Sequence, residues 1–229
     1  MRTPRQPSLT RAMIAARFPD PVQDDPGAHK LVSEEELSAG LDRILLEHDE
    51  GDLWLFGYGS LMWNPEVDFA ESRPALLKGW HRRFCLWQWR YRGSRHHPGL
   101  MLALDRGGAC RGIAYRIAAP GVRDKIIAVW RREMGGNGYR PRWVRLTTMQ
   151  GPVRALVFVA NHSGERYAGR ISEEIVADHI AQACGENGSS AEYLLETVLR
   201  SEELGIHDPF LWRLQEMVAE RMRASEETR

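Results

Sequence analysis

The sequence predicts an α+β protein whose mixed sheet is curled or closed into a barrel and flanked by helices. Two observations support this fold class. From residue 52 to 160 the chain has short apolar or alternating runs typical of strands, with one helical interruption. After residue 160 the apolar residues recur at helical spacing. Strands first and helices later are typical of α+β domains, and 229 residues suffice for one generous core.

The first fifty residues are predicted to form an N-terminal arm and a capped helix, ahead of a single domain over residues 51–229. Proline and arginine are frequent before residue 30, and no acidic residue precedes Asp20. We therefore expect an irregular arm with one short helical turn around residues 9–18, although an organellar transit peptide shares this arginine bias. A helix should begin at Ser33, because Ser33 and Glu36 have the spacing of a capping box.

Seven strands and one helix are expected between residues 52 and 160. The strands cover residues 53–58, 74–78, 82–90, 99–104, 110–117, 142–148 and 152–160, and the helix covers residues 122–134. Three more helices should follow at residues 171–184, 190–203 and 209–224. Ser189 or Ser190 can cap the second of these, and Asp208 with Pro209 is a favourable start for the third.

The helix over residues 122–134 carries a carboxylate on its apolar face. The residues three, four and seven positions before Glu133 are Trp130, Val129 and Ile126, so Glu133 should point inward. Burial raises the pKa of a carboxyl group, and so does the negative end of a helix dipole. A glutamate of this kind suits general base catalysis near neutral pH. The alternative is a surface glutamate in a frayed last turn, paired with a neighbouring arginine.

Two glycines, Gly57 and Gly59, end the apolar run of residues 53–56. A strand that turns sharply at its end exposes backbone N–H groups that can bind an anion. A dinucleotide-binding fingerprint would need a third glycine where Met62 stands. A hydrolase nucleophile elbow would need glycines two residues on either side of Ser60, which are absent. The alternative to an anion-binding turn is a plain glycine-rich β-turn.

Residues 81–97 give the main competing signal, because they are basic, contain no acid and include alternating aromatic residues. Such a segment can bind single-stranded nucleic acid, but alternating aromatics in a strand more often form core or a pocket wall. His81, His96 and His97 have no acidic or cysteine partner at ligand spacing. We therefore expect no nucleic-acid partner and no metal.

The composition is that of a charge-balanced protein. Lys plus Arg and Asp plus Glu both total 31, so no net charge favours nucleic acid or a membrane surface. The three cysteines, Cys85, Cys110 and Cys184, are scattered in apolar surroundings and are interpreted as reduced structural thiols. No apolar run is long enough to span a bilayer, and no signal-peptide core follows Met1. These features predict a cytoplasmic protein with no membrane partner; they leave the oligomeric state open.

Six stretches of the sequence together resemble the ChaC-like branch of the γ-glutamylcyclotransferase family. They are Tyr58-Gly59-Ser60-Leu61, Gly79-Trp80-His81-Arg82-Arg83-Phe84, Gly112-Ile113-Ala114-Tyr115-Arg116, Arg132-Glu133-Met134, Tyr139-Arg140-Pro141-Arg142-Trp143-Val144 and Ala191-Glu192-Tyr193-Leu194. Their order and spacing agree over about residues 52–222, roughly three quarters of the chain. No single stretch is as specific as a metal-finger signature, but six in the right order are persuasive.

The resemblance implies a γ-glutamylcyclotransferase-like fold and a carbon–nitrogen lyase that needs no cofactor. Its small-molecule substrate would be glutathione, cyclised to 5-oxoproline with release of cysteinylglycine. By the resemblance, Glu133 is the general acid and base, and Tyr193 lies near the reacting group. The implied substrate-binding residues are Tyr58, Gly59, Ser60, Leu61, Tyr139 and Tyr193. Two alternatives stay open: a cyclotransferase for other γ-glutamyl amines or amino acids, and a non-catalytic binding domain of the same fold.

Overall fold

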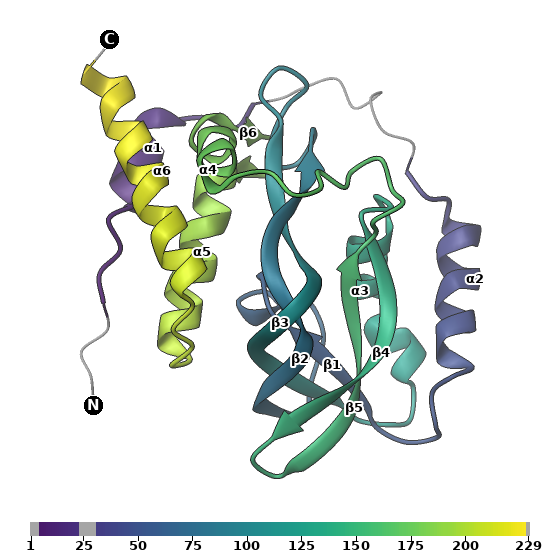
Figure 1. Cartoon of the computed structure of the whole chain (residues 1–229). Coiled ribbons are helices and arrows are strands. Elements are labelled where there is room, and N and C mark those ends of the chain that lie inside the picture. Colours follow the sequence, from purple (N-terminus) through teal and green to yellow (C-terminus); the bar gives the residue numbers. More distant parts are fainter. Residues whose placement is uncertain (1–4, 23–30, 228–229) are drawn as a thin grey trace. The chain divides into compact units, whose positions relative to one another are not determined.

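The computed structural model describes residues 5–22 and 31–227 (Figure 1). The chain divides into two compact units. One, here called the helical unit, comprises Met1–Ala28, Phe84–Leu102 and Ala168–Arg229; the other, the barrel unit, comprises His29–Arg83 and Ala103–Tyr167. Residues 1–4 and 23–30 of the expected N-terminal arm lie outside the described residues. The single domain expected over residues 51–229 stays a prediction.

Five strands form a closed barrel in the order β1-β3-β2-β4-β5. Their bounds are Leu53–Gly57 for β1, Glu71–Gln88 for β2, Gly99–Ile117 for β3, Tyr139–Thr148 for β4 and Gly151–Ala160 for β5. Strand β1 pairs antiparallel with β3 and parallel with β5, whereas β4 and β5 form an antiparallel hairpin. The mixed, closed sheet predicted from the sequence is confirmed.

Four of the expected strands are in fact two. Residues 74–78 and 82–90 were expected as separate strands, as were 99–104 and 110–117, but β2 and β3 run through both breaks. Gly79 lies at the expected break in β2 with φ +82°, and Gly107 lies at the break in β3 with φ +103°. Glycine adopts positive φ without a steric penalty, so a strand can bend there and continue. The expectation of seven strands was therefore wrong in number, although not in location.

Two helices of the barrel unit pack against each other and place Glu133. Helix α3, Val122–Met134, buries Ile126, Val129, Trp130 and Glu133. Helix α2, Glu34–Leu45, accepts a hydrogen bond of 2.8 Å at the carbonyl of Leu37 from the indole N–H of Trp130. The predicted capping box of α2 is confirmed, with Glu36 N–H donating to Ser33 Oγ at 3.2 Å and Ser33 N–H donating to Glu36 at 3.1 Å.

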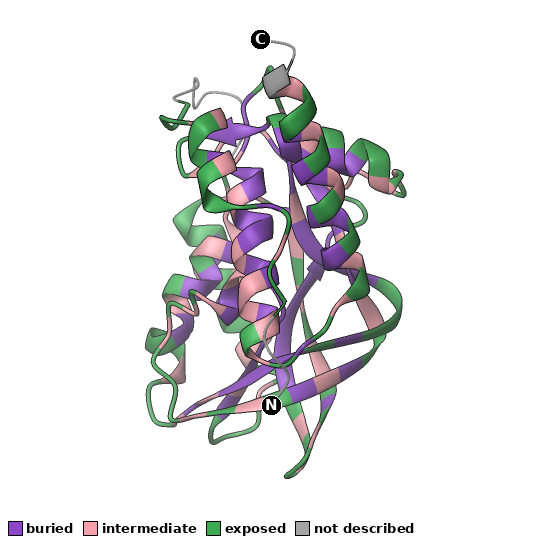
Figure 2. Ribbon diagram, turned by 90° about the vertical axis from the view of Figure 1, so that its left-hand side faces the viewer, coloured by how far each residue is buried: buried purple, intermediate pink, exposed green. Residues whose placement is uncertain are grey.

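The helical unit contains the N-terminal helix and the three C-terminal helices. Their bounds are Arg11–Arg17 for α1, Glu173–Gln182 for α4, Ser190–Glu203 for α5 and Pro209–Glu227 for α6. Helices α4 and α6 are buried along one face and exposed along the other, whereas α5 is mostly buried (Figure 2). The arm docks onto α6, because the N–H of the fully buried Leu9 donates to the side chain of the fully buried Gln215 at 2.9 Å.

The helix expected over residues 171–184 ends earlier, at Gln182. It is followed by two very short strands, β6 (Cys184–Gly185) and β7 (Gly188–Ser189), which the sequence did not predict. Their tight turn needs a left-handed residue, and Gly188 supplies it with φ +93°. None of the helices in the described ranges is both long and apolar enough to cross a bilayer.

Candidate active site

Glu133 lies in the last turn of α3 and is only 9% exposed. Its position on the apolar stripe with Ile126, Val129 and Trp130 is the reason for this burial, as the sequence predicted. The contact expected of the alternative is also present, because Arg132 pairs with Glu133. Glu133 is thus a buried carboxylate with one cationic partner, which is a common arrangement for groups with perturbed acid–base properties.

Arg132 connects α3 to residues 64–66, which follow the glycine-containing turn at the end of β1. On the Glu133 side, Arg132 Nε donates to Oε1 at 3.1 Å, and Nη2 lies 3.1 Å from the same oxygen. On the other side, Nη1 donates to the carbonyl of Asn64 at 2.9 Å and lies 3.2 Å from Oε1 of Glu66. The guanidinium group therefore lies between two carboxylates, one buried and one exposed.

The environment of Glu133 raises its pKa above the ordinary value. Burial is the largest cause and outweighs the positive charge and hydrogen bond of Arg132, which lower the pKa. The negative charge of Glu66 raises it further, and the charge of Arg166 lowers it. Within the described residues, all hydrogen bonds to Glu133 go to Oε1. No hydrogen bond to Oε2 is found among the described residues.

The turn after β1 presents backbone donors. Ser60–Met62 forms a single turn of 3₁₀ helix, which leaves the first N–H groups without intrahelical acceptors. No acceptor in the described part of the chain takes the N–H groups of Gly59, Ser60 and Leu61. A side chain at Gly57 would be tightly packed, because a Cβ there would lie 3.0 Å from the ring of Tyr115 and 3.1 Å from Leu61 Cβ. The turn is compact and can bind an anionic group through its backbone.

Tyr58 is fixed in this turn at both its side chain and its backbone. Its hydroxyl donates to the carbonyl of Phe158 at 2.7 Å, and its own carbonyl accepts a hydrogen bond of 2.6 Å from Arg82 Nε. The side chain of Arg82 also donates to the carbonyl of Arg111. The Tyr58 hydroxyl proton is used in the hydrogen bond to Phe158, so the side chain of Tyr58 has a structural role in holding the turn.

Sequence reasoning placed Arg82 in the basic segment and in one of the six family-like stretches, but missed its supporting role. Arg82 is 6% exposed and lies on β2 with the same strand parity as Phe84 and Leu86, which are fully buried. That parity was the available signal, because alternate residues of a strand point to the same face. An arginine on the inward face must hydrogen-bond internally, and Arg82 does so with the turn at Tyr58.

The glycine-rich turn after Glu133 is held by hydrogen bonds from outside α3. Asn161, at the end of β5, donates from Nδ2 to the carbonyl and side-chain oxygens of Asn137, both at 3.1 Å. Its backbone N–H donates to the carbonyl of Gly138 at 2.9 Å. Tyr139 then starts β4 opposite Ala160 and is partly buried. The end of α3 is therefore a fixed turn that leads directly into the barrel.

The barrel unit thus contains Glu133, the turn of residues 58–61 and Tyr139. Tyr193, by contrast, belongs to the helical unit, where it lies on α5 and is 2% exposed. Its ring packs edge-to-face on Phe84 at 6.1 Å, and the Arg92 guanidinium lies 5.8 Å from its centroid. Tyr193 is a packed residue of its unit, and its predicted place near the reacting group stays a prediction.

The basic segment of residues 81–97 is largely engaged in internal ion pairs. Arg90 pairs with Glu186 at 3.1 Å, and Arg92 pairs with Glu192 at 2.7 Å. Within residues 5–22 and 31–227, no three His, Cys, Asp or Glu side chains gather closely enough to hold a metal ion. The expectation of no nucleic-acid partner stays a prediction.

The fold is shared with a solved γ-glutamyl cyclotransferase. The crystal structure of the yeast γ-glutamyl cyclotransferase specific to glutathione superposes with a TM-score of 0.67 at 20% sequence identity, covering 75% of this chain and 97% of that one. At this identity the likeness establishes the fold alone. The closed barrel and this likeness place the protein in the γ-glutamylcyclotransferase-like fold class.

Sequence comparison then gives the family. The ChaC-like protein family model matches residues 53–221, and the chain belongs to this family. The glutathione-specific γ-glutamylcyclotransferase of Escherichia coli (strain K12) is 40% identical over 180 residues, which cover 78% of each protein. Glutathione-specific γ-glutamylcyclotransferase 1 of Danio rerio is 32% identical over 173 residues, covering 72% of this chain and 88% of that protein.

Proposed function

We propose that this protein is a glutathione-specific γ-glutamylcyclotransferase that converts glutathione to 5-oxoproline and cysteinylglycine, with Glu133 as its general acid and base. The observation that carries the proposal is the buried Glu133 carboxylate, whose Oε1 is held by Arg132 and whose Oε2 has no hydrogen bond among the described residues. The 40% identity to a protein named for this activity supports the choice of substrate.

The reaction needs little from the protein beyond positioning and proton transfer. The α-amine of the γ-glutamyl group attacks its own γ-carbonyl carbon, so one C–N bond forms and the C–N bond to cysteine breaks. The attacking nitrogen changes from an ammonium to a lactam N–H, and the released nitrogen changes from an amide N–H to an ammonium. Protons are therefore only moved, and no water is consumed. Because the attack is intramolecular, holding the substrate in a folded shape supplies much of the rate enhancement.

Glu133 is suited to move these protons. A base must first take a proton from the α-ammonium, and the resulting acid must then protonate the departing nitrogen. One carboxyl group can do both in sequence if its pKa lies close to the working pH. Burial raises the pKa of Glu133 toward that range, and the pairing at Oε1 leaves Oε2 as the oxygen that exchanges the proton.

The turn of residues 58–61 is proposed to bind the charged parts of the substrate. The N–H groups of Gly59, Ser60 and Leu61 can donate hydrogen bonds to the α-carboxylate or to the oxyanion that develops on the γ-carbonyl. Such donors stabilise the transition state most when they are fixed before the substrate binds. Arg82 and Phe158 fix the turn at Tyr58, which supports this role.

The expected location of the reaction is the cytoplasm, where glutathione is kept reduced. The burial of Cys85, Cys110 and Cys184 without a disulfide is consistent with the reduced thiols that the sequence predicts.

Purified protein incubated with reduced glutathione, without added metal or nucleotide, tests the proposal. Mass spectrometry should detect 5-oxoproline and cysteinylglycine in equal amounts, and Glu133→Gln should lower the rate by about 10²- to 10⁴-fold while circular dichroism stays unchanged. A Glu133→Gln variant with wild-type turnover would contradict the role of Glu133. Turnover of γ-glutamyl-alanine in preference to glutathione would indicate a cyclotransferase for other γ-glutamyl compounds. Binding without turnover of either compound would indicate a non-catalytic domain.

A further inference from the structure

We infer that Glu66 is a positioning residue for Glu133, because it holds Arg132 in its bridging position and its negative charge opposes the positive charge of Arg132 at Glu133. This inference rests on the proposed role of Glu133 and extends it to a residue outside the helix. The link is direct in the structure, since Nη1 of Arg132 lies 3.2 Å from Glu66 while its Nε and Nη2 face Glu133.

An anchor of this kind is needed because Arg132 and Glu133 are adjacent on a helix. Successive helical side chains point about 100° apart, so neighbouring residues do not normally meet. The guanidinium of Arg132 nevertheless contacts Glu133. An arginine loses much rotamer freedom in such a position, and unanchored it would extend into water. The Asn64 carbonyl and Glu66 supply the anchor.

The backbone at Glu66 indicates that its position is imposed. Glu66 has φ +50°, a left-handed conformation that is uncommon for a residue other than glycine. Its Oε1 also accepts a hydrogen bond of 3.0 Å from the side chain of Asn64. Asn64 therefore contacts both partners of the ion pair: its side chain donates to Glu66, and its carbonyl accepts from Arg132. The segment of residues 64–66 is thus shaped so that one carboxylate meets the Arg132 guanidinium.

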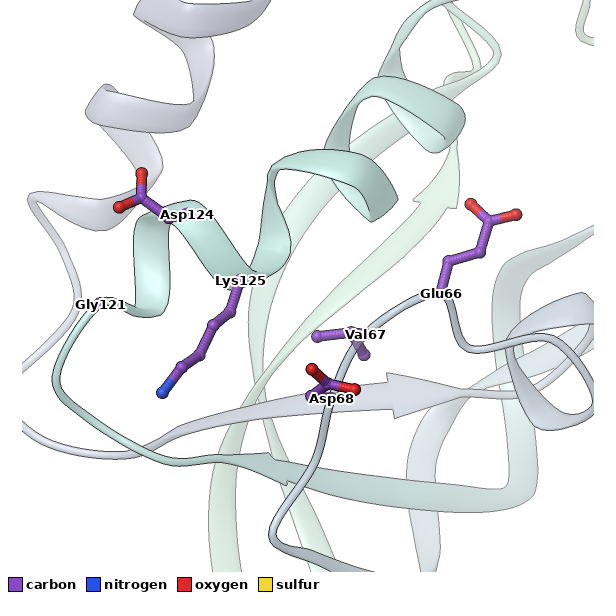
Figure 3. Close-up of a pocket in the computed structure, with 6 residues that line it drawn as sticks. All are labelled: Glu66, Val67, Asp68, Gly121, Asp124 and Lys125. Carbon is purple, nitrogen blue, oxygen red and sulfur yellow. The ribbon is translucent and has the colours of Figure 1, made fainter.

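The other cation near Glu66 does not compete for it. Glu66 lies at the edge of a surface pocket of about 680 Å³ that is also lined by Val67, Asp68, Gly121, Asp124 and Lys125. Figure 3 shows the Glu66 carboxylate directed away from Lys125. The Lys125 ammonium donates instead to the carbonyls of Ala118 and Pro120. The charge of Glu66 therefore acts on Arg132, while Asp68 lines the same pocket without contacting Arg132.

Among the charged groups with the largest effects on the pKa of Glu133, Glu66 is the one that opposes the arginines. Arg132 and Arg166 favour the carboxylate form of Glu133, whereas Glu66 disfavours it. Removing the charge of Glu66 leaves the Arg132 charge unopposed by it, so Glu133 should become more acidic and a weaker base. Because the Glu66 side chain is 38% exposed, salt should reduce the effect without abolishing it.

The pH dependence of kcat/KM for glutathione tests this inference with three variants. Glu66→Gln keeps the shape of the side chain and an acceptor for Arg132 but loses the negative charge. The low-pH limb of the kcat/KM profile should therefore move to lower pH by roughly 0.5 to 1 unit. Glu66→Ala also loses the acceptor, so its plateau kcat should be at least about fivefold below that of Glu66→Gln. Asp68→Asn, the matched control from the same pocket, should leave the limb where it is.

A titration of the Glu133 carboxyl by ¹³C NMR gives a second measurement that does not need turnover. The Glu133 resonance is identified by its loss in Glu133→Gln, and its midpoint should fall in Glu66→Gln but not in Asp68→Asn. Unchanged midpoints in Glu66→Gln, or equal shifts in Asp68→Asn, would overturn the inference. A wild-type protein without turnover would refute the proposed function, while the NMR midpoints would still decide the role of Glu66.

Discussion

Two nitrogens of Arg132, Nε and Nη2, converge on the same oxygen of Glu133, Oε1, each at 3.1 Å. A bidentate pair would engage both carboxylate oxygens and strongly favour the ionised form. The observed arrangement instead holds one oxygen and leaves the other unengaged by the described residues. Glu133 is thereby kept in a fixed orientation, and burial still dominates its pKa.

The first prediction concerns the pH dependence of activity. Because the pKa of Glu133 is raised above its ordinary value of 4.5, the base loses its function as the pH falls through that raised value. The low-pH limb of kcat/KM should therefore lie above pH 4.5. A pH profile with glutathione as substrate measures it, and a limb at or below the ordinary glutamate value would contradict the assignment of Glu133 as the base.

A second prediction concerns stability. The folded protein binds a proton at Glu133 more tightly than the unfolded chain does, so ionisation of Glu133 destabilises the fold as the pH rises through the raised pKa. Glu133→Gln cannot ionise, and it should be more stable than wild type above this window, by about 1.4 kcal/mol for each unit of pKa difference. The advantage should shrink below the unfolded pKa. Urea unfolding of both proteins at pH 4 and pH 7.5 measures it, and a difference independent of pH would refute it.

A third prediction concerns the support of the turn by Arg82. Arg82→Met leaves the buried carbonyl of Tyr58 and the part-buried carbonyl of Arg111 without this donor, so the free energy of unfolding should fall by about 2–3 kcal/mol. The KM for glutathione should also rise, because the turn is no longer fixed. Urea unfolding and steady-state kinetics check both effects. Arg106→Met, an exposed change on β3, is the control and should alter stability by less than about 0.5 kcal/mol.

A fourth prediction concerns the packing of α3 on α2. Trp130→Phe removes the indole donor to Leu37 and some buried volume, so unfolding should become easier by about 1–3 kcal/mol. It should also lower kcat, because α3 carries Glu133. Trp143→Phe removes a similar hydrogen bond to Ile44, of 3.2 Å, at a partly exposed site on β4 and provides the comparison. Equal losses of kcat in the two variants would show that activity does not depend specifically on the packing of α3.

Local sequence patterns predicted several features of this structure correctly. The spacing of Ile126, Val129 and Trp130 placed Glu133 on a buried face, because helical periodicity is set within a few residues. The pair Ser33 and Glu36 located the start of α2 for the same reason. The closed sheet also followed from the order of strand-like and helix-like segments.

Features that depend on contacts between distant segments could not be predicted. Arg132 meets Asn64 and Glu66 only because the fold brings the end of α3 beside the segment after β1. No spacing rule connects these positions, and the left-handed backbone of Glu66 has no signal in its residue type. The predicted number of strands was wrong because a glycine such as Gly79 can either end a strand or bend it. The residues next to it in the sequence do not show which of the two occurs.

The hydrogen bond from Trp130 to Leu37 has a consequence for where the protein can be cut. The family match begins at residue 53, whereas α2 ends at Leu45 and lies entirely before it. A shortened protein that starts at residue 50 would expose the side of Trp130 that α2 covers and leave its indole N–H facing water. Helix α2 is therefore as much a part of the folded catalytic unit as the strands, and a truncation guided by family boundaries alone would remove the support behind Glu133.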